Sequence, residues 1–173
     1  SVHVHLNVLD FTKDQVMDFT LLYAVFERLF YRFTGRGRMK NIYCVPLVDT
    51  TLLVNLTSKE FGGDMWSKYT GMNILPVTSQ GTVEFRHMHG CADVGKLSIW
   101  INLITKLKEY VKANSTKDIR SDIIQMDDDY PYEQMLSSIF GEHAADLKYA
   151  GLEDVSYLPV KQALTSKTVT TRQ

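Results

Sequence analysis

The sequence predicts an α+β domain in which amphipathic helices pack on one face of a curved antiparallel sheet. Three observations lead to this prediction. The chain opens on alternating apolar residues, two long stretches carry apolar residues at helical spacing, and two short runs joined at a glycine have the pattern of a β-hairpin. The length of 173 residues fits one domain.

The composition is that of an ordinary globular protein. The 19 Lys and Arg balance 20 Asp and Glu, and 45% of the residues are hydrophobic. Without a basic excess we expect no nucleic-acid partner, and without an apolar run of about 20 residues we expect no membrane span. Two cysteines, Cys44 and Cys91, are too few for a disulfide framework, so we expect free thiols in a reducing compartment.

The first strand and the first helix have clear signals. Residues 2–9 alternate, so that one face carries Val2, Val4, Leu6 and Val8 and the other carries His3, His5, Asn7 and Leu9. A helix then begins at Thr12, where Gln15 completes a capping box, and it ends at Gly35. Its apolar stripe comprises Val16, Phe19, Leu22, Tyr23, Phe26, Leu29 and Phe30.

The middle of the chain predicts short strands and loops. Residues 41–47 read as a strand ended by proline, residues 50–56 fit either a strand or a helix, and Gly62-Gly63 marks a loop. Residues 72–78 and 81–88 read as a hairpin joined through Ser79-Gln80-Gly81. In its second run, one face carries Thr82, Glu84 and Arg86, and the other carries Val83 and Phe85.

The C-terminal half predicts helices. One helix covers about 93–112 with Asp93 as N-cap and a buried stripe of Leu97, Trp100, Ile101, Ile104, Leu107 and Val111. Another begins at Tyr130-Pro131 and carries Met135, Leu136, Ile139 and Phe140. The acidic run 127–129 before it favours capping over metal binding. We take 1–112 as the C-terminal part of a larger domain, 113–163 as a helical extension of the same domain and 164–173 as a flexible tail.

Each polar constellation allows two interpretations. His3 and His5 are either metal ligands or surface histidines. Glu84 and Arg86 form either an ordinary ion pair or a metal ligand beside a phosphoryl-neutralising arginine. The cations Arg32, Arg36, Arg38 and Lys40 either favour a helix C-terminus or clamp an anion, and Arg38 stands apart because it lies beyond Gly35.

The order of these motifs resembles the amidoligase family of the glutamine synthetase and glutamate–cysteine ligase superfamily. The resemblance covers residues 1–112, whereas residues 113–173 match no family that we can name. It is carried by His3, His5 and Asn7, then Arg38, Asn41, Tyr43 and Cys44, then Lys68, Tyr69 and Asn73, and last Gly81, Thr82, Glu84, Phe85, Arg86 and Gly90.

The resemblance implies a glutamine-synthetase-like fold and an ATP- and Mg²⁺-dependent ligase that joins a carboxylate to an amine through an acyl phosphate. It implies that His3, His5 and Glu84 hold the metal. Arg86 and Arg38 would be catalytic and would bind phosphate, with Asn73 and Lys68 also at the cofactor. The substrates would be a small-molecule or peptide carboxylate and an amine. The implied location is the cytoplasm of a bacterium or of a phage-infected host, with a virion as another setting.

The chain departs from that family in one respect, because it contains no Glu-x-Glu strand to supply acidic metal ligands. We therefore expect an upstream segment or a companion chain to complete the site. The alternative is a non-catalytic structural or interaction module of a larger assembly, such as a phage particle. A metal-dependent hydrolase that uses the two histidines is a third interpretation.

Overall fold

The structure is a computed structural model that describes residues 1–57, 66–90, 93–127, 130–147 and 155–166. Its elements are β1 (Val4–Asn7), α1 (Lys13–Thr34), η1 (Arg36–Lys40), η2 (Leu47–Asp49), α2 (Leu52–Leu56), β2 (Met72–Asn73), α3 (Pro76–Gln80), β3 (Thr82–Phe85), α4 (Val94–Ala113), α5 (Thr116–Gln125), α6 (Tyr130–Phe140), η4 (Gly141–His143), α7 (Ala144–Leu147) and α8 (Tyr157–Thr165). The fold is thus mixed α and β, mostly helical, with a small open antiparallel sheet of three strands.

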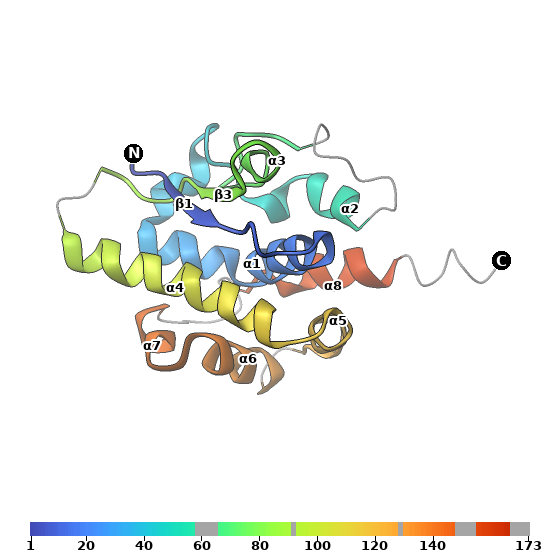
Figure 1. Cartoon of the computed structure of the whole chain (residues 1–173). Coiled ribbons are helices and arrows are strands. Elements are labelled where there is room, and N and C mark those ends of the chain that lie inside the picture. The colour runs from blue at the N-terminus through green and yellow to red at the C-terminus, as the bar shows by residue number, and fades with distance from the viewer. Residues whose placement is uncertain (58–65, 91–92, 128–129, 148–154, 167–173) are drawn as a thin grey trace.

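Helix α1 is the centre of the fold. Every residue from Asp18 to Glu27 is buried, and the helix contacts α4, α5, α7 and α8. Figure 1 shows α1 between the strands above it and α6 and α7 below it. The predicted capping box and the stop at Gly35, where φ is 122°, are both confirmed. The helix is therefore more deeply buried than its predicted stripe suggested.

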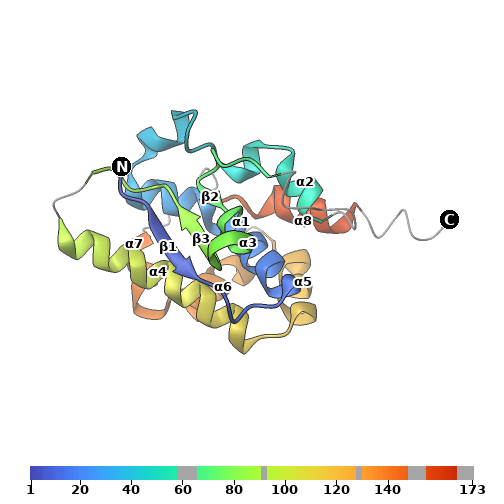
Figure 2. The same ribbon diagram turned by 45° about the horizontal axis from the view of Figure 1, so that its top comes forward.

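The sheet lies on one side of α1 with the strand order β1-β3-β2 (Figure 2). One face of the sheet packs on α1, because the ring of Phe85 lies edge-on to the rings of Phe19 and Tyr23. His5 and Asn73 both pair with Glu84 in the strand register. The face that bears these three residues is the one that the alternation of residues 2–9 predicted to be polar.

Two predicted strands are wrong in whole or in part. Residues 41–47 form a turn rather than a strand, and Val45 alone makes an isolated bridge to Thr70. The turn forms because Asn41 Oδ1 accepts the N–H of Tyr43, while Pro46 lacks an N–H for a ladder. Strand 72–78 stops at Asn73.

The hairpin is therefore an antiparallel pair with a short helix in its connection. Pro76 suits the first turn of a helix, so α3 forms between β2 and β3 and ends at Gly81, where φ is 66°. β3 ends at Phe85 rather than at residue 88.

Other expectations are settled by the described helices. The ambiguous stretch 50–56 contains helix α2. In α4 the N-cap Asp93 is confirmed, but Ile101 is 41% exposed and Leu103 is buried in its place. Helix α6 begins at Tyr130, and α8 extends two residues into the expected tail. Gly62-Gly63, Cys91, residues 128–129 and residues 167–173 lie outside the described residues.

Lysines of α4 hold the segment that follows β1. Lys108 Nζ donates to the carbonyl of Asn7 at 2.9 Å, and Lys112 Nζ donates to the carbonyl of Asp10 at 3.0 Å. The carboxylate of Asp10 lies 2.9 Å from Lys108 and 3.3 Å from Lys112. No described helix is both long and apolar enough to cross a membrane.

Gly71 is the point of closest approach between the sheet edge and α1. A Cβ built there would lie 2.8 Å from the Tyr23 hydroxyl, 2.9 Å from His87 Nε2 and closer still to the Tyr31 hydroxyl. Only glycine fits this position without moving three buried side chains.

We predict that Gly71→Ala destabilises the protein by about 1–3 kcal/mol, because overpacking forces these buried groups apart. Urea unfolding measures the change. Gly37→Ala is the matched control, since a Cβ at Gly37 meets nothing within 4 Å; its effect should stay within about 0.5 kcal/mol. Equal effects of the two substitutions would contradict the prediction.

Candidate functional site

The polar face of the sheet gathers four predicted residues around the carboxylate of a fifth, Glu84. The Glu84 cluster consists of Glu84, His3, His5, Asn73 and Arg86. Asn73 Nδ2 donates to Glu84 Oε2 at 2.9 Å, and Arg86 Nε donates to the same oxygen at 3.1 Å. His3 Nδ1 lies 2.7 Å from Glu84 Oε1, and His5 Nε2 lies 3.9 Å from it. Both carboxylate oxygens are therefore engaged.

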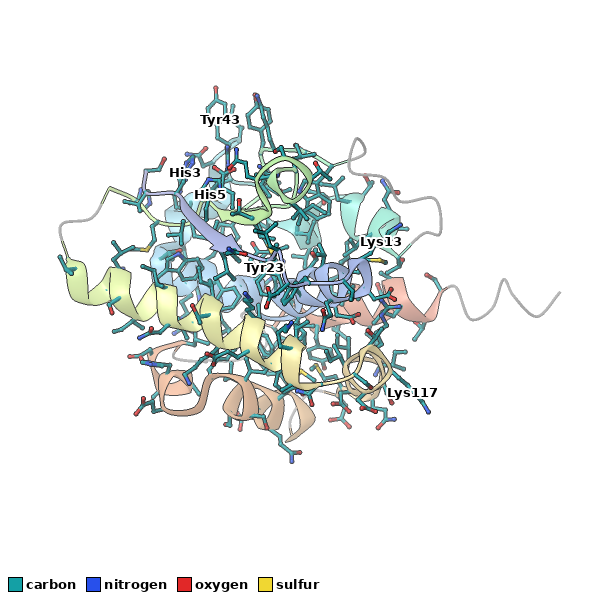
Figure 3. The ribbon with its side chains drawn as sticks, viewed as in Figure 1. His3, His5, Lys13, Tyr23, Tyr43 and Lys117 are labelled. Atoms are coloured by element: carbon teal, nitrogen blue, oxygen red, sulfur yellow. The ribbon has the colours of Figure 1, made fainter. Side chains whose placement is uncertain are left out.

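The two histidines form the outer wall of the cluster. Their side chains are 37% and 39% exposed, whereas the side chain of Glu84 is 8% exposed. His5 Nδ1 lies 3.0 Å from the Thr82 hydroxyl across the strand pair, and His3 Nε2 lies 3.2 Å from the Ser1 hydroxyl. Figure 3 shows His3 and His5 together at the surface, on the opposite side of the molecule from Lys117. The cluster is thus open to solvent on the histidine side.

The surroundings of Glu84 favour its ionised form. Burial acts to raise the pKa of Glu84, but the hydrogen bonds from Asn73 and Arg86 and the positive charges of Arg86 and His3 outweigh it. The pKa of Glu84 is therefore lowered, and at neutral pH the site holds a carboxylate beside a guanidinium.

Arg38 supports the cluster from the interior. Its Nη2 donates to the carbonyl oxygen of Arg86, and the side chain is nearly buried, at 8% exposed. Cys44 Sγ approaches the same carbonyl at 3.5 Å. Arg38 Nε is buried without a hydrogen-bond partner among the described residues. Arg38 thus braces the main chain of Arg86, and its assignment as a phosphate ligand stays a prediction.

The other two predicted cofactor residues occupy different positions. Asn73 is buried and is engaged with Glu84 and with the N–H of Leu75, so it positions the carboxylate. Lys68 is exposed, and its Nζ lies 5.2 Å from the centre of the Tyr69 ring. The described contacts therefore bring Asn73 into the cluster but not Lys68.

The cluster has donor types that metal ions accept, but the set is short of oxygen and its atoms are spaced as in hydrogen bonds rather than as in a metal site. Neighbouring ligands of an octahedral ion at about 2.1 Å lie roughly 3 Å apart, whereas one histidine nitrogen lies closer than this to Glu84 Oε1 and the other lies farther away. Two imidazoles and one carboxylate suit Zn²⁺ better than Mg²⁺, which prefers oxygen ligands. No group of three or more His, Cys, Asp or Glu in the described ranges is arranged as a metal site.

A buried polar network beneath the cluster escaped the sequence analysis. Glu27 accepts the N–H groups of Leu47 and Val48 at 2.6 and 3.0 Å and the Tyr23 hydroxyl at 2.6 Å. His87 Nε2 lies 2.9 Å from that hydroxyl. One signal was present, because Glu27 interrupts an otherwise apolar stripe four residues after Tyr23. These contacts form the Glu27 network.

Desolvation dominates the chemistry of this network. Burial raises the pKa of Glu27 to about 7 and lowers the pKa of His87 to about 3. Burial also raises the pKa of the Cys44 thiol, which is free as predicted. Near neutral pH His87 and Cys44 are therefore neutral and Glu27 is partly ionised, and these groups serve as structural supports.

The chain matches no protein-family model, no curated protein and no solved structure. The function therefore has to be argued from the geometry of the Glu84 cluster.

We predict that Glu27→Gln changes how stability depends on pH. With a folded pKa near 7 against 4.5 for the unfolded chain, Glu27 contributes stability that is complete below pH 4.5 and lost as pH rises to 7. His87 has the opposite dependence, because its contribution is lost as pH falls from 6.5 to 3. Between pH 4.5 and 6.5, Glu27 lowers the free energy of unfolding of the wild type as pH rises, whereas His87 raises it.

Glu27→Gln removes the pH dependence that Glu27 contributes and leaves that of His87 in place. The free energy of unfolding of the variant, relative to wild type, should rise by about 1.4 kcal/mol per pH unit between pH 5 and 6.5. Urea titrations at several pH values measure this. Glu109→Gln, at an exposed position of α4, makes the same change outside the core and should show no such trend. A constant difference between Glu27→Gln and wild type would contradict the prediction.

Proposed function

We propose that the chain is the catalytic part of an ATP- and Mg²⁺-dependent ligase with a glutamine-synthetase-like fold that forms an amide bond between a carboxylate and an amine. The observation that carries the proposal is the arrangement of His3, Glu84 and Arg86 on one open sheet face. Strand register places His5 opposite Glu84, and His3 and Arg86 lie one residue beyond the ends of β1 and β3, where both contact the Glu84 carboxylate.

These groups suit phosphoryl transfer, which depends on positioning and charge neutralisation more than on covalent help. Arg86 would neutralise negative charge on the γ-phosphoryl group as it moves from ATP to a carboxylate oxygen and ADP departs. The amine nitrogen then attacks the acyl carbon, phosphate leaves, and the nitrogen loses a proton. Arg38 would keep Arg86 in place through the main-chain carbonyl.

His3, His5 and Glu84 would hold the Mg²⁺, which supplies charge neutralisation at the phosphates when bound. One carboxylate is few for this ion, so further oxygen ligands would come from the nucleotide and from an upstream segment or companion chain. β1 offers an edge for such a segment. Val2 and Val8 donate to the carbonyls of Met88 and Gly81, on either side of β3, so the alternate N–H and C=O groups, at His3 and His5, face away from β3. ATP dependence fits a cytoplasmic location.

We predict that Arg86→Ala lowers turnover by about 10³-fold or more, because it removes the charge that stabilises the transferring phosphoryl group. The assay follows ADP release with Mg²⁺, ATP and pools of carboxylates and amines. The chain is tested alone and joined to any sequence that its reading frame adds upstream. ADP release that requires both a carboxylate and an amine supports the ligase.

Two variants serve as controls. Arg86→Lys keeps the charge without the planar two-pronged contact and should retain part of the activity. Lys117→Ala removes an exposed cation on the far side of the molecule and should leave turnover unchanged (Figure 3). If no form of the chain binds ATP, the ligase proposal fails and a non-catalytic interaction module becomes the better interpretation.

A further inference from the structure

Two tyrosines stand exposed beside the Glu84 cluster. Tyr43 is 57% and Tyr69 is 41% exposed, and their ring centres lie 5.4 Å apart with an angle of 68° between the planes. Figure 3 shows Tyr43 projecting from the same side of the molecule as His3 and His5. An edge-to-face pair leaves ring surface available to a further flat group.

Hydrogen bonds hold the backbone of both tyrosines. Tyr43 N–H donates to Asn41 Oδ1 at 2.8 Å, and Tyr69 N–H donates to the Ser67 hydroxyl at 3.3 Å. The two segments are joined directly, because Val45 N–H donates to the Tyr69 carbonyl at 2.7 Å. The backbone positions from which the two rings project are therefore held together, which lowers the cost of binding a ligand to both.

The same segments are attached to Arg86. Val45 accepts the N–H of Gly71, and Gly71 in turn accepts the N–H of Arg86 at 2.9 Å. Cys44, the neighbour of Tyr43, contacts the Arg86 carbonyl. The aromatic pair and the guanidinium thus belong to one connected backbone unit, with the cation Lys68 beside the Tyr69 ring.

We propose that Tyr43 and Tyr69 form the binding platform for the base of a purine nucleoside triphosphate whose phosphates lie at the Glu84 cluster. This inference rests on the proposed function and adds the residues that recognise the nucleotide ring. A flat aromatic base stacks on tyrosine, the triphosphate requires Arg86, and Lys68 contributes positive charge beside the Tyr69 ring. A ligand that carries both a flat aromatic ring and a group with several negative charges matches this combination of residues.

The test compares two probes by calorimetry with the whole chain: Mg-ATP, which has a base, and Mg-tripolyphosphate, which has none. Tyr43→Ala and Tyr69→Ala should each weaken ATP binding by about 5- to 150-fold, the usual range for loss of one base stack. Neither should change the affinity for tripolyphosphate. Tyr43→Phe and Tyr69→Phe keep the rings and should bind ATP like wild type.

Further variants separate this inference from the proposed function. Arg86→Ala should weaken both probes, and Val54→Ala, which shortens an exposed apolar side chain on α2, should affect neither. If the tyrosine-to-alanine variants bind ATP as wild type does while Arg86→Ala weakens it, the platform is refuted and the ligase proposal stands. If they weaken both probes equally, the platform is also refuted. Failure of wild type to bind either probe overturns both proposals.

Discussion

The hydrogen bonds that Glu27 accepts from Leu47 and Val48 tie the central helix to the loop beside the sheet. That loop carries Tyr43 and Cys44, and its residue Val45 accepts the N–H of Gly71, whose carbonyl in turn accepts the N–H of Arg86 at the end of β3. Because the carboxyl group is fully buried, leaving these N–H groups without a partner would cost about 1–3 kcal/mol each. The placement of the surface cluster therefore depends on a polar contact in the interior.

The Glu84 cluster has a rigid, buried part and a part that is open to solvent. Asn73 and Arg86 hold one oxygen of Glu84 inside the sheet, while the two histidines face solvent at the other oxygen. A ligand that enters from the histidine side meets a carboxylate whose orientation is already fixed. Such preorganisation is what electrostatic catalysis requires, since little rearrangement remains to be done when charge develops.

The periodicity of the sequence correctly predicted those elements whose capping residues and apolar spacing agree with the way they pack in the fold. The capping box at Thr12, the N-cap Asp93 and the two faces of β1 and β3 are all as expected, and His5 meets Glu84 because β1 and β3 pair in regular register. The predicted strand over 41–47 does not form, because Asn41 and Pro46 favour a turn although the residues between them are mostly apolar. Helix α3 likewise replaced part of a strand at Pro76.

The long-range supports were beyond such patterns. No spacing rule relates Arg38 to the carbonyl of Arg86, and none shows that Glu27 faces the main chain of Leu47. A side chain that hydrogen-bonds to a backbone group of a distant segment produces no regular spacing of residues in the sequence. Helices α5 and α8, which pack on each other and on α1, also had weak signals of their own.

The lysine contacts at the end of β1 make ionic strength a variable of the site. Lys108 and Lys112 secure Asn7 and Asp10 through partly exposed charges, which salt screens over a Debye length of about 8 Å at physiological ionic strength. The strand that carries His3 and His5 is otherwise paired on one side only, with β3. Raising the salt concentration should therefore loosen the histidine wall before it affects the buried, hydrogen-bonded position of Glu84.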